Sequence, residues 1–184
     1  MKVRHCASPH CDARPDGERV SLIVLHAISL PPGEFALRHV RELFLGCLDT
    51  ASGSQFSELE GLHVSAHCVV DRNGDITQFV PFAKRAWHAG ASCWQDRECC
   101  NDFSIGIELI GDEQSPFTDL QYSTAAALCR EIMRQFPAID PDAITGHQNI
   151  APGRKWDPGH QWSWPRFRSL LDQATPPPVC GLRQ

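Results

Sequence analysis

Three side chains that could carry out chemistry lie close together between Gly146 and Gly159. The segment reads Gly-His-Gln-Asn-Ile-Ala-Pro-Gly-Arg-Lys-Trp-Asp-Pro-Gly and holds the imidazole of His147, the ammonium of Lys155 and the carboxylate of Asp157. Its prolines fix φ and its glycines permit positive φ, so the backbone is expected to follow one defined path. We hypothesise that His147 and Asp157 are two ligands of a catalytic zinc ion, with Lys155 beside them. The rest of the chain must then supply a third ligand and a base.

The spacing of these residues suits a hydrolytic zinc site. Such a site uses three protein ligands, among which histidine and aspartate are common, and leaves the fourth position to water. The connection from His147 to Asp157 is ten residues long, which lets the chain return to one metal ion. In an extended backbone Lys155 and Asp157 point to the same side, so the ammonium could stabilise the oxyanion formed when water attacks a carbonyl.

Two apolar segments each contain one ionisable residue. Residues 20–28 and 103–110 are almost continuously apolar, which is typical of central strands covered on both faces, yet they contain His26 and Glu108. A buried unpaired carboxylate is costly, so Glu108 must have a partner or face a cleft with a raised pKa. Each residue could also have a purely structural role, such as a hydrogen-bonded core histidine. Their joint occurrence with the 146–159 segment favours a shared active site.

Residues 65–80 have the pattern of a β-hairpin, with Asn73-Gly74 between two apolar runs. This pair predicts a type I′ turn, in which both central residues have positive φ. Residues 81–103 are expected to form a long loop, and loops of this length in compact domains often line a binding site. Trp87 and His88 in this loop are therefore candidate substrate contacts.

The clearest helix is expected over residues 118–136. Thr118 and Gln121 match a capping box, the following apolar residues recur at helical spacing, and a proline ends the pattern. Shorter helices are expected near 35–48 and 165–173. Strands mixed with helices and one hairpin predict an α/β domain with a mixed central β-sheet flanked by helices.

Length and composition bound the other possibilities. A chain of 184 residues fits a single domain, which we expect to span 1–184, with a core over roughly 8–172 and a frayed tail at 173–184. The net charge of −5 and the lack of a basic stripe argue against nucleic acid as a partner. No apolar run is long enough for a membrane span. We expect a monomer acting on a small molecule.

The nine cysteines have no regular framework spacing, and the first residues contain no apolar signal segment. Reduced thiols and a cytoplasmic location are therefore expected. Other metal ligands are less favoured: His63 and His67 lie in a strand-and-hairpin context, and Cys99-Cys100 lacks the Cys-x-x-Cys spacing of a structural zinc site. The chain also lacks a nucleophile elbow, a Walker loop and a Rossmann glycine pattern.

Five runs of residues, in the same order along the chain, resemble one family. They are Leu25-His-Ala-Ile-Ser-Leu-Pro-Pro-Gly-Glu34, Val64-Ser-Ala-His67, Arg85-Ala-Trp-His-Ala-Gly90, Asn101-Asp-Phe-Ser-Ile-Gly-Ile-Glu-Leu109 and Gly146-His followed by Ile-Ala-Pro-Gly-Arg-Lys-x-Asp-Pro-Gly159. The chain resembles the zinc-dependent N-acetylmuramoyl-L-alanine amidases, and most of all their cytoplasmic 1,6-anhydro form used in cell-wall recycling. The resemblance spans roughly residues 8–170.

The resemblance implies a mixed sheet flanked by helices, shared with peptidoglycan recognition proteins. It also implies that zinc (Zn2+) is the cofactor, that His26, His147 and Asp157 are its ligands, that Glu108 is the general base and that Lys155 polarises the carbonyl. The expected reaction is hydrolysis of the amide between the lactyl group of anhydro-N-acetylmuramic acid and L-alanine of a muropeptide.

The chain departs from the family pattern at positions near the expected site. Ala27 stands where the family usually has asparagine, and His63 and Cys99 stand where relatives carry arginine, so Ala27 and His63 join the candidate substrate contacts. Two other functions remain open. One is a non-catalytic muropeptide-binding module, in which a zinc ligand would be lost; the other is an amidase that acts on intact murein.

Overall fold

Two long parallel strands form the centre of the structure. β3 (Leu22–Ile28) and β9 (Ser104–Ile110) pair over all seven residues of each strand, with His26 beside Glu108. Every residue of β9 is buried, as are the first five of β3. Strands covered on both faces are rich in apolar residues because neither side meets water. The strands predicted over 20–28 and 103–110 are therefore confirmed.

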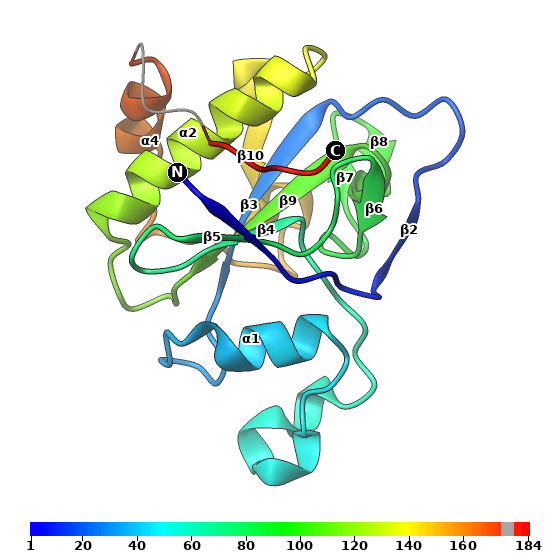
Figure 1. Cartoon of the computed structure of the whole chain (residues 1–184), viewed down its shortest axis with the longest axis vertical. Helices are drawn as coiled ribbons and strands as arrows, with labels where there is room; N and C mark the ends of the chain where they lie inside the picture. The colour runs from blue at the N-terminus through cyan, green and yellow to red at the C-terminus, as the bar shows by residue number, and fades with distance from the viewer. Residues whose placement is uncertain (174–178) are drawn as a thin grey trace.

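The computed structural model describes residues 1–173 and 179–184. Within these ranges six strands form one mixed sheet in the order β1–β5–β4–β9–β3–β10 (Figure 1). The strands β4, β9, β3 and β10 run parallel, β5 runs antiparallel to β4, and β1 is parallel to β5. This sheet and its helices confirm the predicted fold class. The four further strands are β1 (Val3–His5), β4 (Cys68–Val70), β5 (Ile76–Gln78) and β10 (Ile144–Gly146).

Helices cover the sheet from both sides (Figure 1). The long α2 (Asp119–Gln135) and α4 (Trp164–Leu171) lie on one side, with α1 (Leu37–Phe44) on the other. All three lie inside or at the edges of the predicted helical ranges. Short helical segments complete the chain: η1 (Thr50–Ser52), η2 (Ser54–Leu59), η3 (Cys100–Asp102), η4 (Pro141–Ala143) and α3 (His147–Ile150).

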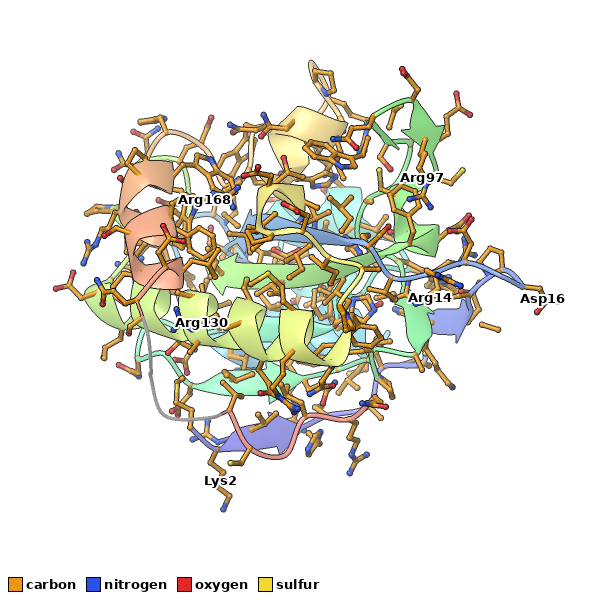
Figure 2. The ribbon with its side chains drawn as sticks, turned by 90° about the horizontal axis from the view of Figure 1, so that it is seen from above. Lys2, Arg14, Asp16, Arg97, Arg130 and Arg168 are labelled. Carbon is orange, nitrogen blue, oxygen red and sulfur yellow. The ribbon has the colours of Figure 1, made fainter. Side chains whose placement is uncertain are left out.

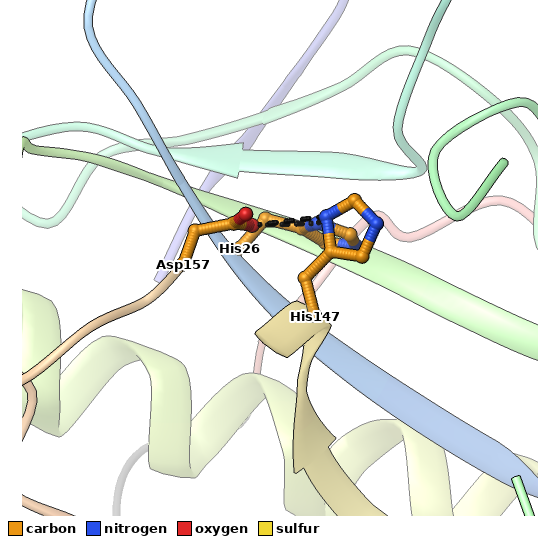
Figure 3. Close-up of side chains that lie close together, drawn as sticks. All are labelled: His26, His147 and Asp157. Atoms are coloured by element: carbon orange, nitrogen blue, oxygen red, sulfur yellow. Dashed lines mark hydrogen bonds and ion pairs between the residues drawn. The ribbon is translucent and has the colours of Figure 1, made fainter. Parts of the chain in front are cut away.

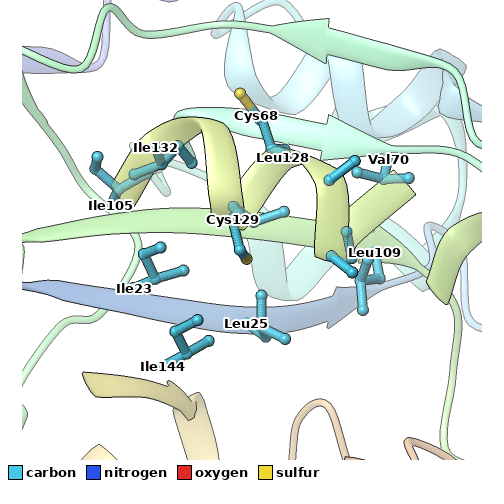
Figure 4. Packing of buried hydrophobic residues seen from close by; sticks show 14 of the residues in the cluster. Ile23, Leu25, Cys68, Val70, Ile105, Leu109, Leu128, Cys129, Ile132 and Ile144 are labelled. Atoms are coloured by element: carbon cyan, nitrogen blue, oxygen red, sulfur yellow. The ribbon is translucent and has the colours of Figure 1, made fainter. Parts of the chain in front are cut away.

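The period-two alternation of a strand divides the central strands into two faces. One face is apolar and packs against α2, as Figure 4 shows, through Ile23 and Leu25 of β3 and Ile105 and Leu109 of β9. Ile107 of β9 belongs to the same core cluster. The opposite face of β9 carries Ser104, Gly106 and Glu108. Burial of apolar side chains stabilises both faces. On the opposite face Leu22, Val24 and Ile110 belong to smaller apolar clusters, and His26 and Glu108 lie beside them.

The hairpin between β4 and β5 is antiparallel, as predicted, but the predicted type I′ turn is wrong. Gly74 has a φ of 77°, whereas Asn73 is not among the described non-glycine residues with positive φ. The backbone N–H of Gly74 donates to Asp71 O at 2.9 Å, and the Asp71 carboxylate accepts from the N–H groups of Asn73 and Asp75. This carboxylate stabilises a turn that needs positive φ only at its glycine.

Short strands also form where the sequence suggested none. β1 and β2 (Cys11–Ala13) lie in residues 1–19, before the first predicted strand, and β2 pairs with β6 (Lys84–Ala86) of the predicted long loop. That loop also contains the antiparallel pair β7 (Cys93–Trp94) and β8 (Arg97–Glu98). Strands of two or three residues carry too little periodicity to be recognised, because their pairing depends on a distant partner.

Arg14 fastens the N-terminal segment to this loop region (Figure 2). Its guanidinium donates to the carbonyl oxygens of Phe82, Asn101, Asp102 and Ser104 at distances of 2.8 to 3.3 Å. Burial lowers the pKa of Arg14 to about 10, so the group remains charged at neutral pH. One side chain thus joins the N-terminal segment to the start of β9.

The predicted frayed tail is wrong for residues 179–184, whereas 174–178 lie outside the described residues. Val179 is buried, and the backbone of Arg183 exchanges hydrogen bonds with the Gln78 side chain and accepts one from Phe82 N. The tail therefore packs beside β5. No helix in the described parts of the chain is long and apolar enough to cross a membrane.

The capping box of α2 allows a direct test of local stability. Thr118 Oγ1 accepts from Gln121 N at 3.1 Å, and Gln121 Oε1 accepts from Thr118 N at 3.1 Å. We expect Thr118→Ala to lower the free energy of unfolding by about 0.5–2 kcal/mol, measured by urea denaturation. Ser123→Ala, on the exposed side of the same helix, is the matched control and should change it by less than about 0.5 kcal/mol. Equal effects of the two substitutions would contradict the role of the cap.

Candidate metal centre

The strand register brings two histidines and a carboxyl group to one level of the sheet. His26 lies near the carboxyl end of β3 and is paired with Glu108 of β9. On the other side of β3, Gly146 of β10 is paired with Leu25, so the next residue, His147, begins α3 beside His26. The carboxyl ends of parallel strands are the usual position of ligand sites in open α/β sheets.

The segment after α3 returns Asp157 to the same place. Gln148 holds the segment around Asp157 with two hydrogen bonds. Its N–H donates to Asp157 O at 2.8 Å, and its Oε1 accepts from Gly159 N at 3.2 Å. Gly159 has a φ of 75°, and a Cβ there would lie 2.9 Å from the ring of Trp156. The bent path expected for residues 146–159 is therefore observed, although its first part is helical rather than loop.

Three ligand-type atoms converge at the end of this path (Figure 3). His26 Nδ1 lies 2.9 Å from His147 Nδ1, and both lie 3.1 Å from Asp157 Oδ2. All three residues are buried, and together they form a group able to hold a metal ion. Two imidazoles and a carboxylate are a donor set that suits a divalent metal such as zinc.

The hydrogen bonds around His147 test whether these residues fit a cation. His147 Nε2 lies 3.0 Å from the carbonyl oxygen of Ala89, which can only accept, so a ring with one hydrogen carries it on Nε2. His147 Nδ1 then presents a lone pair to the Asp157 carboxylate, with no hydrogen between them. Two facing lone pairs repel each other when no cation lies between them, but both can bind the same cation. The residues therefore fit a metal ion.

Burial sets the charge state of His26, which faces His147 and Asp157. It lowers the pKa of His26 to about 4, which leaves that imidazole neutral at physiological pH. A neutral imidazole and an ionised carboxylate are the forms that bind a metal.

Glu108 is the second carboxyl group of the site and has a different environment. It is 8% exposed, and its Oε2 has no hydrogen-bond partner among the described residues. Burial, followed by repulsion from Asp157, raises its pKa well above the ordinary value, while Lys155 opposes the shift. A carboxyl group with a raised pKa is suited to accept and return a proton near neutral pH.

A cavity of about 810 Å³ opens over these groups. Lys155, Trp156 and Glu108 line it together with the three ligand-type residues, and so do three of the predicted substrate contacts: Ala27, Trp87 and His88. The fourth, His63, is not among the described residues that line the cavity. Its ring instead lies against that of His10, with centroids 4.8 Å apart. The structure thus groups five chemically active side chains at one cavity, and His63 is not among its described lining residues.

Several residues around the site were not expected from the sequence. Gln148, Ala89 and Asn101 act through backbone or amide groups, which no pattern of ionisable residues reveals. The three-residue group that could hold a metal does not include His67, nor does it include the sequence neighbours Cys99 and Cys100. These residues were considered unlikely ligands.

Comparison with known proteins agrees with this geometry. The family model described as N-acetylmuramoyl-L-alanine amidase matches residues 16–160. The chain belongs to this amidase family. It is 53% identical to the 1,6-anhydro-N-acetylmuramyl-L-alanine amidase AmpD of Salmonella typhimurium strain SL1344, over 93% of this chain and 91% of the relative. A crystal structure of a Se-Met AmpD derivative has a TM-score of 0.89 at 51% identity, covering 92% of this chain and 94% of the other.

A more distant amidase structure holds a ligand. The complex of Escherichia coli AmiD with anhydro-N-acetylmuramic acid-L-Ala-D-gamma-Glu-L-Lys is 26% identical, with a TM-score of 0.61, and covers 85% of this chain and 60% of that one. The family resemblance drawn from the five sequence motifs is confirmed by these matches.

The raised pKa of Glu108 predicts a pH-dependent gain of stability in Glu108→Gln. Because the folded pKa is raised, the unfolded chain loses this proton first as pH rises, so wild-type stability falls between the unfolded and folded pKa values. Glutamine does not ionise, so the stability of the variant does not fall over this pH range. In metal-free protein, we expect it to be more stable than wild type at pH 7 by on the order of 1 kcal/mol, with a smaller difference at pH 4.

Thermal or urea unfolding at the two pH values measures this effect. Glu98→Gln, which changes an exposed glutamate of β8, is the control and should show no pH-dependent difference. A variant that follows the wild-type pH profile would show that Glu108 is not held in its protonated form.

Proposed function

We propose that the protein is a zinc-dependent amidase that releases the peptide from 1,6-anhydro-N-acetylmuramyl peptides during peptidoglycan recycling. The bond cleaved is the amide between the lactyl group of the sugar and L-alanine. The convergence of His26, His147 and Asp157 beside Glu108 is the observation that carries this proposal. It is supported by the names of the relatives that cover nearly the whole chain.

His26, His147 and Asp157 would hold the zinc ion through two imidazole nitrogens and a carboxylate oxygen. When bound there, zinc supplies a Lewis acid that lowers the pKa of water toward neutrality. The same three residues also fix the position of the attack, because their donor atoms meet at the floor of the cavity that Glu108 lines.

Glu108 would act as the general base and then as the general acid. Its carboxylate takes a proton from the attacking water and returns it to the nitrogen of the leaving L-alanine, so that the amine departs neutral. Two observations support this role: the pKa of Glu108 is raised by burial, and its Oε2 makes no hydrogen bond within the described protein. The unsatisfied oxygen is thus available to a water molecule in the cavity.

Lys155 would stabilise the negative charge that develops on the carbonyl oxygen. Lys155 is exposed and lines the cavity, and it lies two positions before Asp157 in the sequence. A cation directed at this oxygen stabilises the tetrahedral intermediate more than the planar substrate, which is the requirement for a faster reaction. An ammonium on a flexible stem can follow the oxygen as the carbon changes geometry.

The cavity and chain organisation are consistent with a muropeptide substrate. Its volume of about 810 Å³ lies within the usual range for ligand sites. We propose that residues 1–184 act as one amidase domain, supported by the single sheet that positions the three ligand-type residues and Glu108, and that the protein acts as a monomer. A cytoplasmic location is part of the same proposal. It is supported by the cysteines of the described segments, of which Cys6, Cys11, Cys47, Cys68, Cys93, Cys99, Cys100 and Cys129 are free thiols.

Metal removal combined with a choice of substrates tests the proposed function. We expect the purified protein to contain about one equivalent of zinc. Chelation should abolish hydrolysis of an anhydro-muropeptide, and added zinc should restore it. Anhydro-muropeptide should be cleaved faster than intact murein, with products followed by chromatography. Full activity after chelation would contradict the zinc proposal, whereas preference for intact murein would contradict the proposed substrate.

Substitutions at Glu108 and Lys155 test their separate roles. We expect Glu108→Ala to lower kcat by about 100- to 10,000-fold because it removes the proton acceptor. Lys155→Ala should lower kcat by about 100- to 1,000-fold through loss of oxyanion stabilisation. Both variants should retain zinc, measured by elemental analysis. Lys84→Ala, an exposed lysine of β6, is the control and should keep wild-type activity. Retained turnover in either active-site variant would remove that residue from the mechanism.

A further inference from the structure

We propose that the adjacent residues His88 and Ala89 orient both imidazoles of the metal centre. The ring nitrogen Nδ1 of His88 would accept a hydrogen bond from His26 Nε2–H. The carbonyl oxygen of Ala89 accepts one from His147 Nε2–H. Each contact turns the Nδ1 lone pair of the corresponding histidine toward the metal position. The inference rests on the proposed zinc-dependent function and assigns His88 and Ala89 as positioning residues.

The contact to His147 is made by the backbone of Ala89. His147 Nε2 donates to Ala89 O at 3.0 Å, and Arg154 Nη2 donates to the same oxygen at 2.6 Å. Because a carbonyl oxygen cannot donate, this contact permits only the tautomer with hydrogen on Nε2. The side chain of residue 89 is not involved, so the sequence carries no direct sign of this role.

The contact to His26 is made by the ring of His88, and a third residue decides its direction. His26 Nε2 lies 2.9 Å from His88 Nδ1, so one of these nitrogens carries the hydrogen. His88 Nε2 lies 3.2 Å from Ser104 Oγ, whose own hydroxyl donates to the Cys100 carbonyl at 2.5 Å. With its hydrogen already used, Ser104 must accept from His88 Nε2–H.

The chain of donors then runs in one direction only. Neutral His88 carries its hydrogen on Nε2, so its Nδ1 accepts from His26 Nε2–H. His26 Nδ1 is left with a lone pair that faces Asp157 Oδ2 at 3.1 Å. Residues outside a metal site commonly fix their ligands in this way, by hydrogen-bonding the nitrogen that does not bind the metal.

The amide of Asn101 holds the two positioning residues together. Its Oδ1 accepts from the backbone N–H of His88 at 3.1 Å and from that of Ala89 at 2.8 Å. The His88 ring lies against Gly106 of β9, where an added Cβ would be 2.5 Å from His88 Cγ. A glycine in the middle of a buried strand is explained by this close approach.

These contacts change the interpretation of His88. It lines the cavity, as expected for a substrate contact, but its Nδ1 is engaged by His26 and its Nε2 by Ser104. No ring nitrogen is left for a substrate. The structure therefore favours a role in orienting His26 over direct recognition of the muropeptide.

The zinc affinity of Ser104→Ala tests the hydrogen-bond relay from His26 through His88 to Ser104 without any assay of activity. The variant removes the acceptor that fixes the His88 tautomer, so zinc should bind about 10- to 100-fold more weakly in competition with a chromophoric chelator. Ser8→Ala is the matched control, because Ser8 is also buried, donates to the carbonyl of Phe44 and accepts an N–H from His10. Its zinc affinity should stay within about twofold of wild type. Wild-type affinity in Ser104→Ala would overturn the proposal.

Two substitutions at Asn101 separate positioning from general damage to the fold. Asn101→Leu removes the acceptor for both N–H groups and should weaken zinc binding, whereas Asn101→Asp keeps an acceptor oxygen and should restore most of the affinity. Equal zinc affinities of the two variants would contradict the role of Asn101. If Ser104→Ala does not fold, this comparison still tests whether His88 and Ala89 position the metal ligands.

The histidine tautomers can be observed directly in the metal-free protein. NMR of the ring nitrogens should show His26 and His147 protonated at Nε2, with a mixed state of His26 in Ser104→Ala. Protonation of wild-type His26 at Nδ1 would overturn the proposal. If the wild-type protein bound no zinc, the proposed metal-dependent function would fail, but this spectrum would still test the hydrogen-bond relay.

Discussion

The in-register pairing of β3 with β9 is the constraint on which the candidate site depends. It sets His26 beside Glu108, and residues paired in this way point to the same face of the sheet. The pairing of β10 on the other side of β3 then brings His147 to the same level. A shift of one residue in either strand would turn its polar side chain into the apolar layer under α2. Strand register therefore determines whether the site exists.

The same alternation reconciles a buried polar site with a stable fold. Ile105, Ile107 and Leu109 contribute to the core under α2, while the residues between them face the site. The raised pKa of Glu108 shows that its burial opposes ionisation. Such a cost is tolerated where a large apolar layer lies on the other face of the same strands. The larger core thus lies on one side of this pair of strands, and the site shares the other side with two smaller apolar clusters.

The sequence predicted those elements whose pattern is long enough to be read locally. The strands at 20–28 and 103–110 and the capped helix at 118–136 extend over several periods of their own structure, so the apolar spacing identifies them. β1 and β10 have three residues each and form only because a neighbouring strand offers hydrogen bonds. The hairpin turn was misassigned because the carboxylate of Asp71 competes with the local preference of Asn73-Gly74.

The sequence by itself determined which chemical groups were available and, through five ordered motifs, the family to which the chain belongs. It also indicated that His26 and Glu108 are exceptional residues in apolar strands. Only the tertiary structure decided that His26 meets Asp157, 131 positions away, and that His88 faces His26 while His63 is not among the described residues that line the cavity. The reason is physical: local periodicity encodes strands and helices, whereas the atoms that meet depend on register and on backbone carbonyls that carry no residue identity.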